Sequence, residues 1–126
     1  RLQLYPDPEC TQLVDELANL YSVKPSQILL TNGSDEILNF AFMAFCDKDR
    51  PAVFPNITYG FYSVFAELNG VPYEEIPLRE DFTIDVNDYI GKGKNIVIAN
   101  PNAPTGLALS FDDVEKIISS NRVKPV

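Results

Sequence analysis

Three short loops contain the groups in this sequence that are best suited to chemistry. The first is Asn32-Gly33-Ser34-Asp35-Glu36, in which a glycine precedes the expected start of a helix. Glycine permits close approach of a ligand to the backbone, and the first amides of a helix, together with its dipole, favour an anion. The turn therefore predicts a phosphate site. A plain helix cap by Ser34 is the simpler alternative for so short a motif.

The other two loops follow apolar segments further along the chain. In residues 56–60, Tyr59 comes just before an expected helix, where its ring can cover a planar ligand or pack on a neighbouring helix. Residues 100–106 contain two prolines and two asparagines, so this loop is stiff and presents amide groups. The composition favours a ligand-binding loop over a simple connector.

The composition excludes several other chemistries. The 126 residues include no histidine, which removes Ser-His-Asp and Cys-His catalysis, and Cys10 and Cys46 are too few for a disulfide framework or a structural zinc site. The net charge of −8 disfavours a nucleic-acid partner. No apolar run approaches the roughly 18 residues of a membrane span. We therefore expect a cytoplasmic protein that binds a small molecule, with no metal, no nucleic acid and no membrane as partner.

The loops follow elements that can hold them at one edge of a sheet. Asp7-Pro8 and the helical spacing after it predict a helix to about Ser22, and residues 28–31 are predicted to form a short buried strand. A helix from Ser34 is expected to bury Ile37, Leu38, Ala41, Phe42 and Phe45. The later elements expected are a strand at 52–54, a helix at 61–68, a strand at 71–76, a helical turn at 85–89, a strand at 95–99 and a helix from 111 capped by Ser110 and Asp113.

Strands that alternate with helices predict an α/β fold with one open, mostly parallel sheet flanked by helices. In such sheets ligands bind at the carboxyl ends of the strands, where the three loops lie. Residues 1–126 contain no linker or repeat, so we expect one domain. Because the sequence begins with a proline-bounded loop and ends at Lys124-Pro125-Val126 after a helix, we expect a partial domain, truncated at both ends.

Four motifs, taken together, have the order and spacing found in one known family. They are Tyr5-Pro6-Asp7-Pro8, residues 31–36, Pro55-Asn56-Ile57-Thr58-Tyr59 with Tyr62, and Asn100-Pro101-Asn102-Ala103-Pro104-Thr105-Gly106. From Leu4 to about Val114 the sequence resembles the histidinol-phosphate aminotransferases. Other fold-type I pyridoxal-phosphate enzymes share the single motifs, and the first two point to the histidinol-phosphate branch.

The resemblance implies the N-terminal part of the cofactor-binding large domain of a fold-type I transaminase. Such an enzyme of histidine biosynthesis uses pyridoxal 5'-phosphate to exchange an amino group between histidinol phosphate and 2-oxoglutarate. In the family, the turn that matches Gly33, Ser34 and Asp35 holds the cofactor phosphate, and the tyrosine that matches Tyr59 lies over the pyridine ring. The tyrosine that matches Tyr5 reaches across a homodimer interface to the partner's phosphate.

Two positions depart from the family pattern. The family's asparagine directly before Pro-Thr-Gly bonds the cofactor's ring hydroxyl, but Ala103 stands here, and we expect Asn102 or water to replace it. The family's Schiff-base lysine lies well beyond this loop, whereas Lys116, Arg122 and Lys124 are too near and lie on or beside a helix. We therefore expect a fragment that has no catalytic residue and is inactive by itself.

Two other interpretations stay open at the level of the sequence. Threonine-phosphate decarboxylase and the aromatic or aspartate-type aminotransferases share these loops, and most substrate-binding residues lie outside them. A non-catalytic α/β module that binds phosphate through residues 33–36 would have the same turn.

Overall fold

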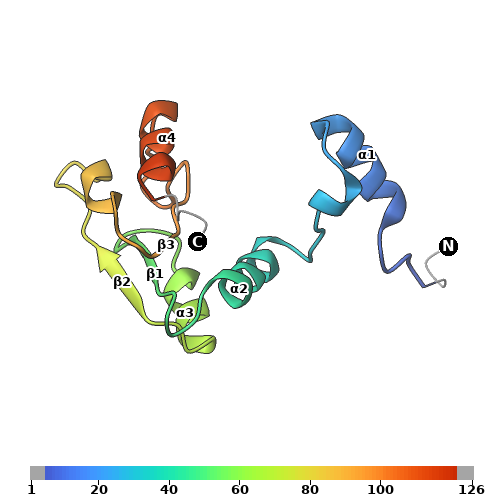
Figure 1. Ribbon diagram of the computed structural model, residues 1–126, viewed down its shortest axis with the longest axis horizontal. Helices are drawn as coiled ribbons and strands as arrows, with labels where there is room; N and C mark the ends of the chain where they lie inside the picture. Colours follow the sequence, from blue (N-terminus) through green and yellow to red (C-terminus); the bar gives the residue numbers. More distant parts are fainter. Residues whose placement is uncertain (1–4, 122–126) are drawn as a thin grey trace. The chain divides into compact units, whose positions relative to one another are not determined.

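The structure, a computed structural model, describes residues 5–121; Leu4, Arg122, Lys124 and the rest of the C-terminal motif lie outside the described residues. The chain divides into two compact units, Arg1–Ile37 and Leu38–Val126, and each has its own internal contacts (Figure 1). Helix α2, Ser34–Phe45, begins in the first unit and ends in the second. The expectation of one partial domain over residues 1–126 stays a prediction.

The first unit contains helix α1, Thr11–Tyr21, and the short 3-10 helix η1, Pro25–Gln27. Helix α1 begins later than the Asp-Pro pattern predicts. The reason is that the Asp7 carboxylate accepts hydrogen bonds from the backbone N–H of Thr11 at 2.8 Å and of Glu9 at 3.0 Å, which hold a turn in front of the helix. The bond from Thr11, and then that from Glu9, keeps the pKa of Asp7 below its ordinary value.

The predicted strand at residues 28–31 is wrong, since this segment is irregular in the structure. A strand needs a hydrogen-bonded neighbour, and the sheet found among residues 5–121 does not include this segment. Leu29 is 65% exposed, so the run is not buried on both faces either. An apolar run of four residues is compatible with a strand but does not supply its partner.

The second unit is built on a three-stranded parallel sheet with the order β2-β1-β3. Strand β1, Ala52–Pro55, pairs on one side with β2, Tyr73–Ile76, and on the other with β3, Asn95–Ile96. All four residues of β1 are buried, as expected for a central parallel strand. The remaining elements of this unit are helix α3 at Phe61–Leu68, the 3-10 helix η2 at Val86–Tyr89 and helix α4 at Phe111–Ser120.

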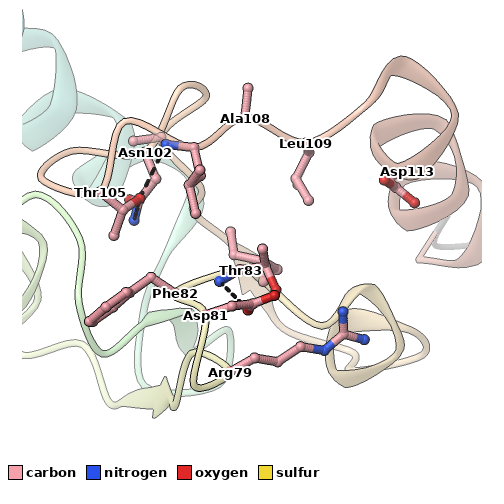
Figure 2. Close-up of a pocket in the computed structure, with 12 residues that line it drawn as sticks. Arg79, Asp81, Phe82, Thr83, Asn102, Thr105, Ala108, Leu109 and Asp113 are labelled. Atoms are coloured by element: carbon pink, nitrogen blue, oxygen red, sulfur yellow. Dashed lines mark hydrogen bonds between the residues drawn. The ribbon is translucent and has the colours of Figure 1, made fainter.

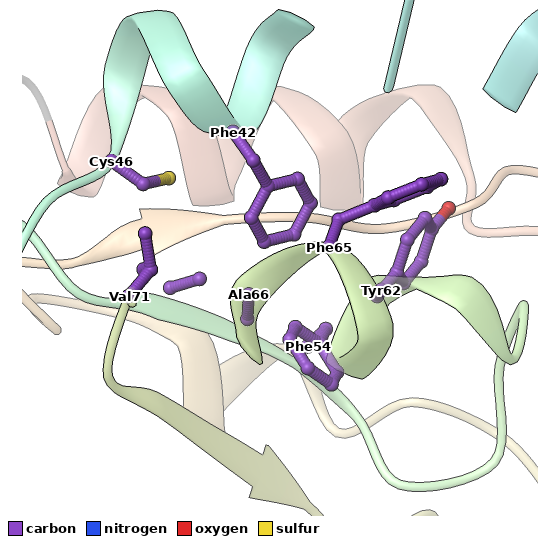
Figure 3. Close-up of a cluster of buried hydrophobic side chains, with 8 residues drawn as sticks. Phe42, Cys46, Phe54, Tyr62, Phe65, Ala66 and Val71 are labelled. Carbon is purple, nitrogen blue, oxygen red and sulfur yellow. The ribbon is translucent and has the colours of Figure 1, made fainter. Parts of the chain in front are cut away.

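Strand β1 sends alternate side chains into two apolar clusters, one on each face of the sheet. Ala52 and Phe54 belong to the cluster drawn in Figure 3, where Phe42 of α2 meets the aromatic side chains of α3. Val53 belongs to the second cluster, with Ile117 of α4 as a further member. Helices therefore flank both faces of a parallel sheet, which confirms the predicted α/β class.

Two predicted details of this unit are wrong. The strand expected over residues 95–99 has only two paired residues, although the N–H of Val97 still donates to the carbonyl oxygen of Val53 at 2.9 Å. In the described part of the sheet β3 is an edge strand, so residues 97–99 have a neighbouring strand on one side only with which to pair. Phe45 is 63% exposed rather than part of the core, whereas Phe42 is buried. The apolar pattern thus overestimated burial at both places.

Candidate functional site

The turn at residues 31–36 has the backbone that the phosphate prediction requires. Gly33 has a φ of 85°, in the left-handed region that glycine adopts most readily, and helix α2 begins at the next residue. The N–H of Gly33 donates to the carbonyl oxygen of Thr31, and the Thr31 hydroxyl donates to the carbonyl oxygen of Gly33, both at 3.0 Å. The turn is thus closed on itself directly before the helix.

Acidic side chains accompany this turn. The Glu36 carboxylate accepts a hydrogen bond from the backbone N–H of Asn32 at 2.7 Å, so its charge is held against the turn's own backbone. Asp35 and Glu36 lie in the first turn of α2, where the helix dipole favours negative charge. Gly33, Ser34 and Asp35 are all exposed, and so is Tyr5 in the same unit. The assignment of these four residues to a phosphate stays a prediction.

Tyr59 lies in the loop between β1 and α3 and is half-buried. Its ring stacks on Phe61, with 5.9 Å between ring centroids, and meets Tyr62 edge-on at 5.8 Å. Burial also raises the pKa of the Tyr62 phenol above its ordinary value. The Tyr59 side chain therefore packs on the start of helix α3, and its predicted role over a cofactor ring stays a prediction.

Asn102 joins the two predicted loops of the second unit. Its Oδ1 accepts a hydrogen bond from the Thr58 hydroxyl at 2.8 Å, and its Nδ2 donates to the carbonyl oxygen of Ile57 at 2.9 Å and to Thr105 Oγ1 at 3.2 Å. The structure thus brings Asn102 together with the residues next to Tyr59. Thr58 and Thr105 were not among the predicted site residues, although both lie in quoted motifs.

A hollow of about 260 Å³ lies beside Asn102 and Thr105 (Figure 2). Its other lining includes charged groups of the loop after β2, which have partners within that loop. Arg79 forms an ion pair with Asp85 at 2.8 Å, which lowers the pKa of the Asp85 carboxyl, and Asp81 accepts from the Thr83 hydroxyl at 2.6 Å. These charges therefore stabilise the loop that borders the hollow.

Two further features are absent from residues 5–121. No cluster of three or more histidine, cysteine, aspartate or glutamate residues is arranged there to hold a metal ion. In the same part of the chain, no helix has both the length and the apolar character needed to cross a bilayer.

The fold described above is one that aminotransferases have. The model of the family aminotransferase class I and II matches residues 1–126, so the chain belongs to this family. The histidinol-phosphate aminotransferase of Brachyspira hyodysenteriae is 51% identical over 121 residues, which are 96% of this chain and 34% of the relative. That of Clostridium botulinum is 46% identical over 125 residues, 99% of this chain and 35% of the relative. The chain thus spans about a third of the length of these relatives.

Solved structures agree with this assignment. A putative histidinol-phosphate aminotransferase from Erwinia carotovora atroseptica has a TM-score of 0.81 and 30% identity, over 93% of this chain and 36% of the other. Cystalysin from Treponema denticola, whose structure contains a pyridoxal 5'-phosphate cofactor, has a TM-score of 0.69 over 94% of this chain and 34% of its own. At 16% identity, cystalysin shows likeness of fold alone.

Proposed function

We propose that this chain is the N-terminal part of the large domain of a pyridoxal-phosphate-dependent aminotransferase that exchanges an amino group between histidinol phosphate and 2-oxoglutarate in histidine biosynthesis. The observation that carries the proposal is the 51% identity to a histidinol-phosphate aminotransferase over 121 residues. The complete protein acts as a cytoplasmic homodimer, and residues outside this chain supply the Schiff-base lysine.

The described residues fit the cofactor by the chemistry of their donors. Gly33, with its positive φ, allows a phosphate to approach the backbone at the positive end of α2, and in this proposal Ser34 and Asp35 complete that cradle. Tyr59 supplies an aromatic face for the pyridine ring, and Tyr5 reaches the phosphate bound by the partner subunit. Bound pyridoxal phosphate supplies an electron sink, while the protein orients it. Asn102 is the remaining residue that the proposal assigns to binding of the cofactor.

The cradle is tested with Ser34→Pro in the full-length protein. This change removes one backbone N–H and one hydroxyl from the proposed phosphate site, yet proline is tolerated at a helix start. Each lost bond to a charged group is worth about 1.5–3 kcal/mol, so affinity for pyridoxal phosphate is expected to fall by roughly one to four powers of ten. Titration of the cofactor-free protein with pyridoxal phosphate and with inorganic phosphate measures both affinities.

Tyr59→Ala is the matched variant for the ring. It is expected to weaken binding of pyridoxal phosphate while leaving the affinity for inorganic phosphate unchanged, because the side chain is assigned to the ring alone. Ser34→Pro is expected to weaken both. If Ser34→Pro changes neither affinity, the turn is only a helix cap and the proposed cradle is wrong.

The reaction is tested by supplying the full-length protein with histidinol phosphate and 2-oxoglutarate and measuring glutamate. Histidinol without its phosphate and the aromatic amino acids serve as competing amino donors. Turnover with an aromatic donor alone would assign the protein to the aromatic branch. Release of carbon dioxide from threonine phosphate would assign it to the decarboxylases.

A further inference from the structure

Asn102 is buried although asparagine usually lies at protein surfaces. Its residue exposure is 3%, and apart from tyrosine and cysteine it is the one polar or charged residue that is buried within residues 5–121. A polar side chain is stable in such a place only when its hydrogen-bonding groups have partners. The partners of this side chain therefore indicate why it is there.

The Asn102 amide uses both of its N–H groups within the protein. One donates to the carbonyl oxygen of Ile57 and the other to Thr105 Oγ1. Because a carbonyl oxygen can only accept, the Ile57 contact also fixes which end of the amide is nitrogen. Asn102 would have to break one of these bonds before it could donate to a cofactor's ring hydroxyl in place of the residue missing at Ala103.

The backbone of Asn102 is held as firmly as its side chain. Its N–H donates to the carbonyl oxygen of Leu107 at 2.8 Å, and its carbonyl oxygen accepts from the N–H of Gly106 at 2.7 Å. These bonds close residues 102–107 into a compact loop. The side chain then ties this loop to Thr58, the residue before Tyr59, through a bond that spans 44 positions of the sequence.

We propose that Asn102 is a positioning residue, which acts through Thr58 to fix the loop that presents Tyr59 to the cofactor ring. The inference rests on the proposed function, and it replaces a direct bond from Asn102 to the cofactor by an indirect action. Loss of the Thr58 hydroxyl then releases the Tyr59 loop and weakens binding of the ring. The phosphate, assigned to the turn at residues 33–35, is held as before.

The test compares Thr58→Val with Thr58→Ser in the full-length protein. Valine keeps the shape of threonine but removes the hydroxyl, whereas serine keeps the hydroxyl. Thr58→Val is expected to weaken binding of pyridoxal phosphate by about 10-fold, as the loss of one part-buried hydrogen bond would, and Thr58→Ser by less than about 3-fold. Both variants are expected to bind inorganic phosphate as the unmodified protein does. If Thr58→Val fails to fold, Thr58→Ala takes its place.

A double-mutant cycle with Tyr59→Ala distinguishes positioning from a general structural effect. Once the ring is gone, Thr58→Val is expected to change the affinity for pyridoxal phosphate by less than about 2-fold. An equal loss in both backgrounds, or no loss in either, overturns the inference while cofactor binding by the unmodified protein still supports the proposed function. If the unmodified protein does not bind pyridoxal phosphate, the proposed function fails and the inference fails with it.

Discussion

The turn at residues 31–36 and the loop at residues 102–107 are both assigned to one cofactor, yet they are held in different ways. The side-chain bonds described for the turn join residues two and four positions apart, namely Thr31 to Gly33 and Glu36 to Asn32. The loop is held by Asn102, whose side chain reaches residues 44 and 45 positions away. The turn depends on local backbone geometry, whereas the loop depends on the tertiary fold. Substitutions in the two regions should therefore have different costs.

The largest effect is expected for Asn102→Leu. Leucine leaves the Thr58 hydroxyl and the Ile57 carbonyl without their partner at a part-buried place, so the free energy of unfolding should fall by about 2–5 kcal/mol. Denaturation of the cofactor-free, full-length protein in urea measures this. Asn100→Leu is the matched control, because Asn100 is exposed and its side chain forms its two hydrogen bonds within residues 5–121 with the backbone of Leu109, across its own loop. Equal losses in the two variants would contradict the distinction between the two regions.

A smaller effect is expected for Gly33→Ala in the local turn. An alanine at a φ of 85° is strained, and the free energy of unfolding should fall by about 1–2 kcal/mol. Gly60→Ala is the control, since Gly60 has a φ of −65° and an added Cβ meets no atom within 4 Å at either glycine. This control should be neutral or slightly stabilising. Comparable destabilisation by both variants would show that the positive φ of Gly33 does not decide the cost.

The same distinction explains how much of the fold could be predicted from the sequence. Helix α3 begins and ends where its apolar spacing and the following Asn-Gly predict, and the central strand was located from its apolar run. Residues 28–31 and 97–99 have similar runs but do not form strands. An apolar run reports a tendency to be buried, whereas a strand also needs a neighbour at the right distance. Pairing is a property of the whole sheet and has no local signal.

The candidate site divides in the same way. The glycine at position 33 indicated a helix start directly after it, and helix α2 begins there; the structure adds that Gly33 has a positive φ. The pairing of Thr58 with Asn102 had no such signal, because each residue sits in a motif that is explained without the other. The sequence offered Asn102 as a substitute for the group missing at Ala103, and only the coordinates identified its partners. Local chemistry thus predicts a turn, and tertiary contacts determine how a loop is braced.

The smallest effect is expected at Asp7, whose carboxylate holds a second turn through local hydrogen bonds. Its carboxylate accepts from Thr11 and Glu9, which lowers its pKa in the folded protein. A group with a lowered folded pKa contributes stability above its unfolded value of about 3.9, and that contribution is lost as the pH falls through the folded value. Asp7→Asn should therefore be less stable than the unmodified protein near pH 7, and the difference should shrink below about pH 4.

Unfolding free energies of the full-length protein, measured from pH 7 down to pH 2, test this prediction. Glu9→Gln is the control, because it removes the same unit of charge two residues away and leaves the Asp7 carboxylate and its two N–H donors in place. Its difference from the unmodified protein should not follow the titration of Asp7. A difference for Asp7→Asn that stays constant or grows as the pH falls would show that the turn is held by the shape of the side chain and not by its charge. In that case the hydrogen bonds of the Asp7 turn would not depend on charge, as is true of the hydrogen bonds of Asn102, whose side chain is an uncharged amide that does not titrate.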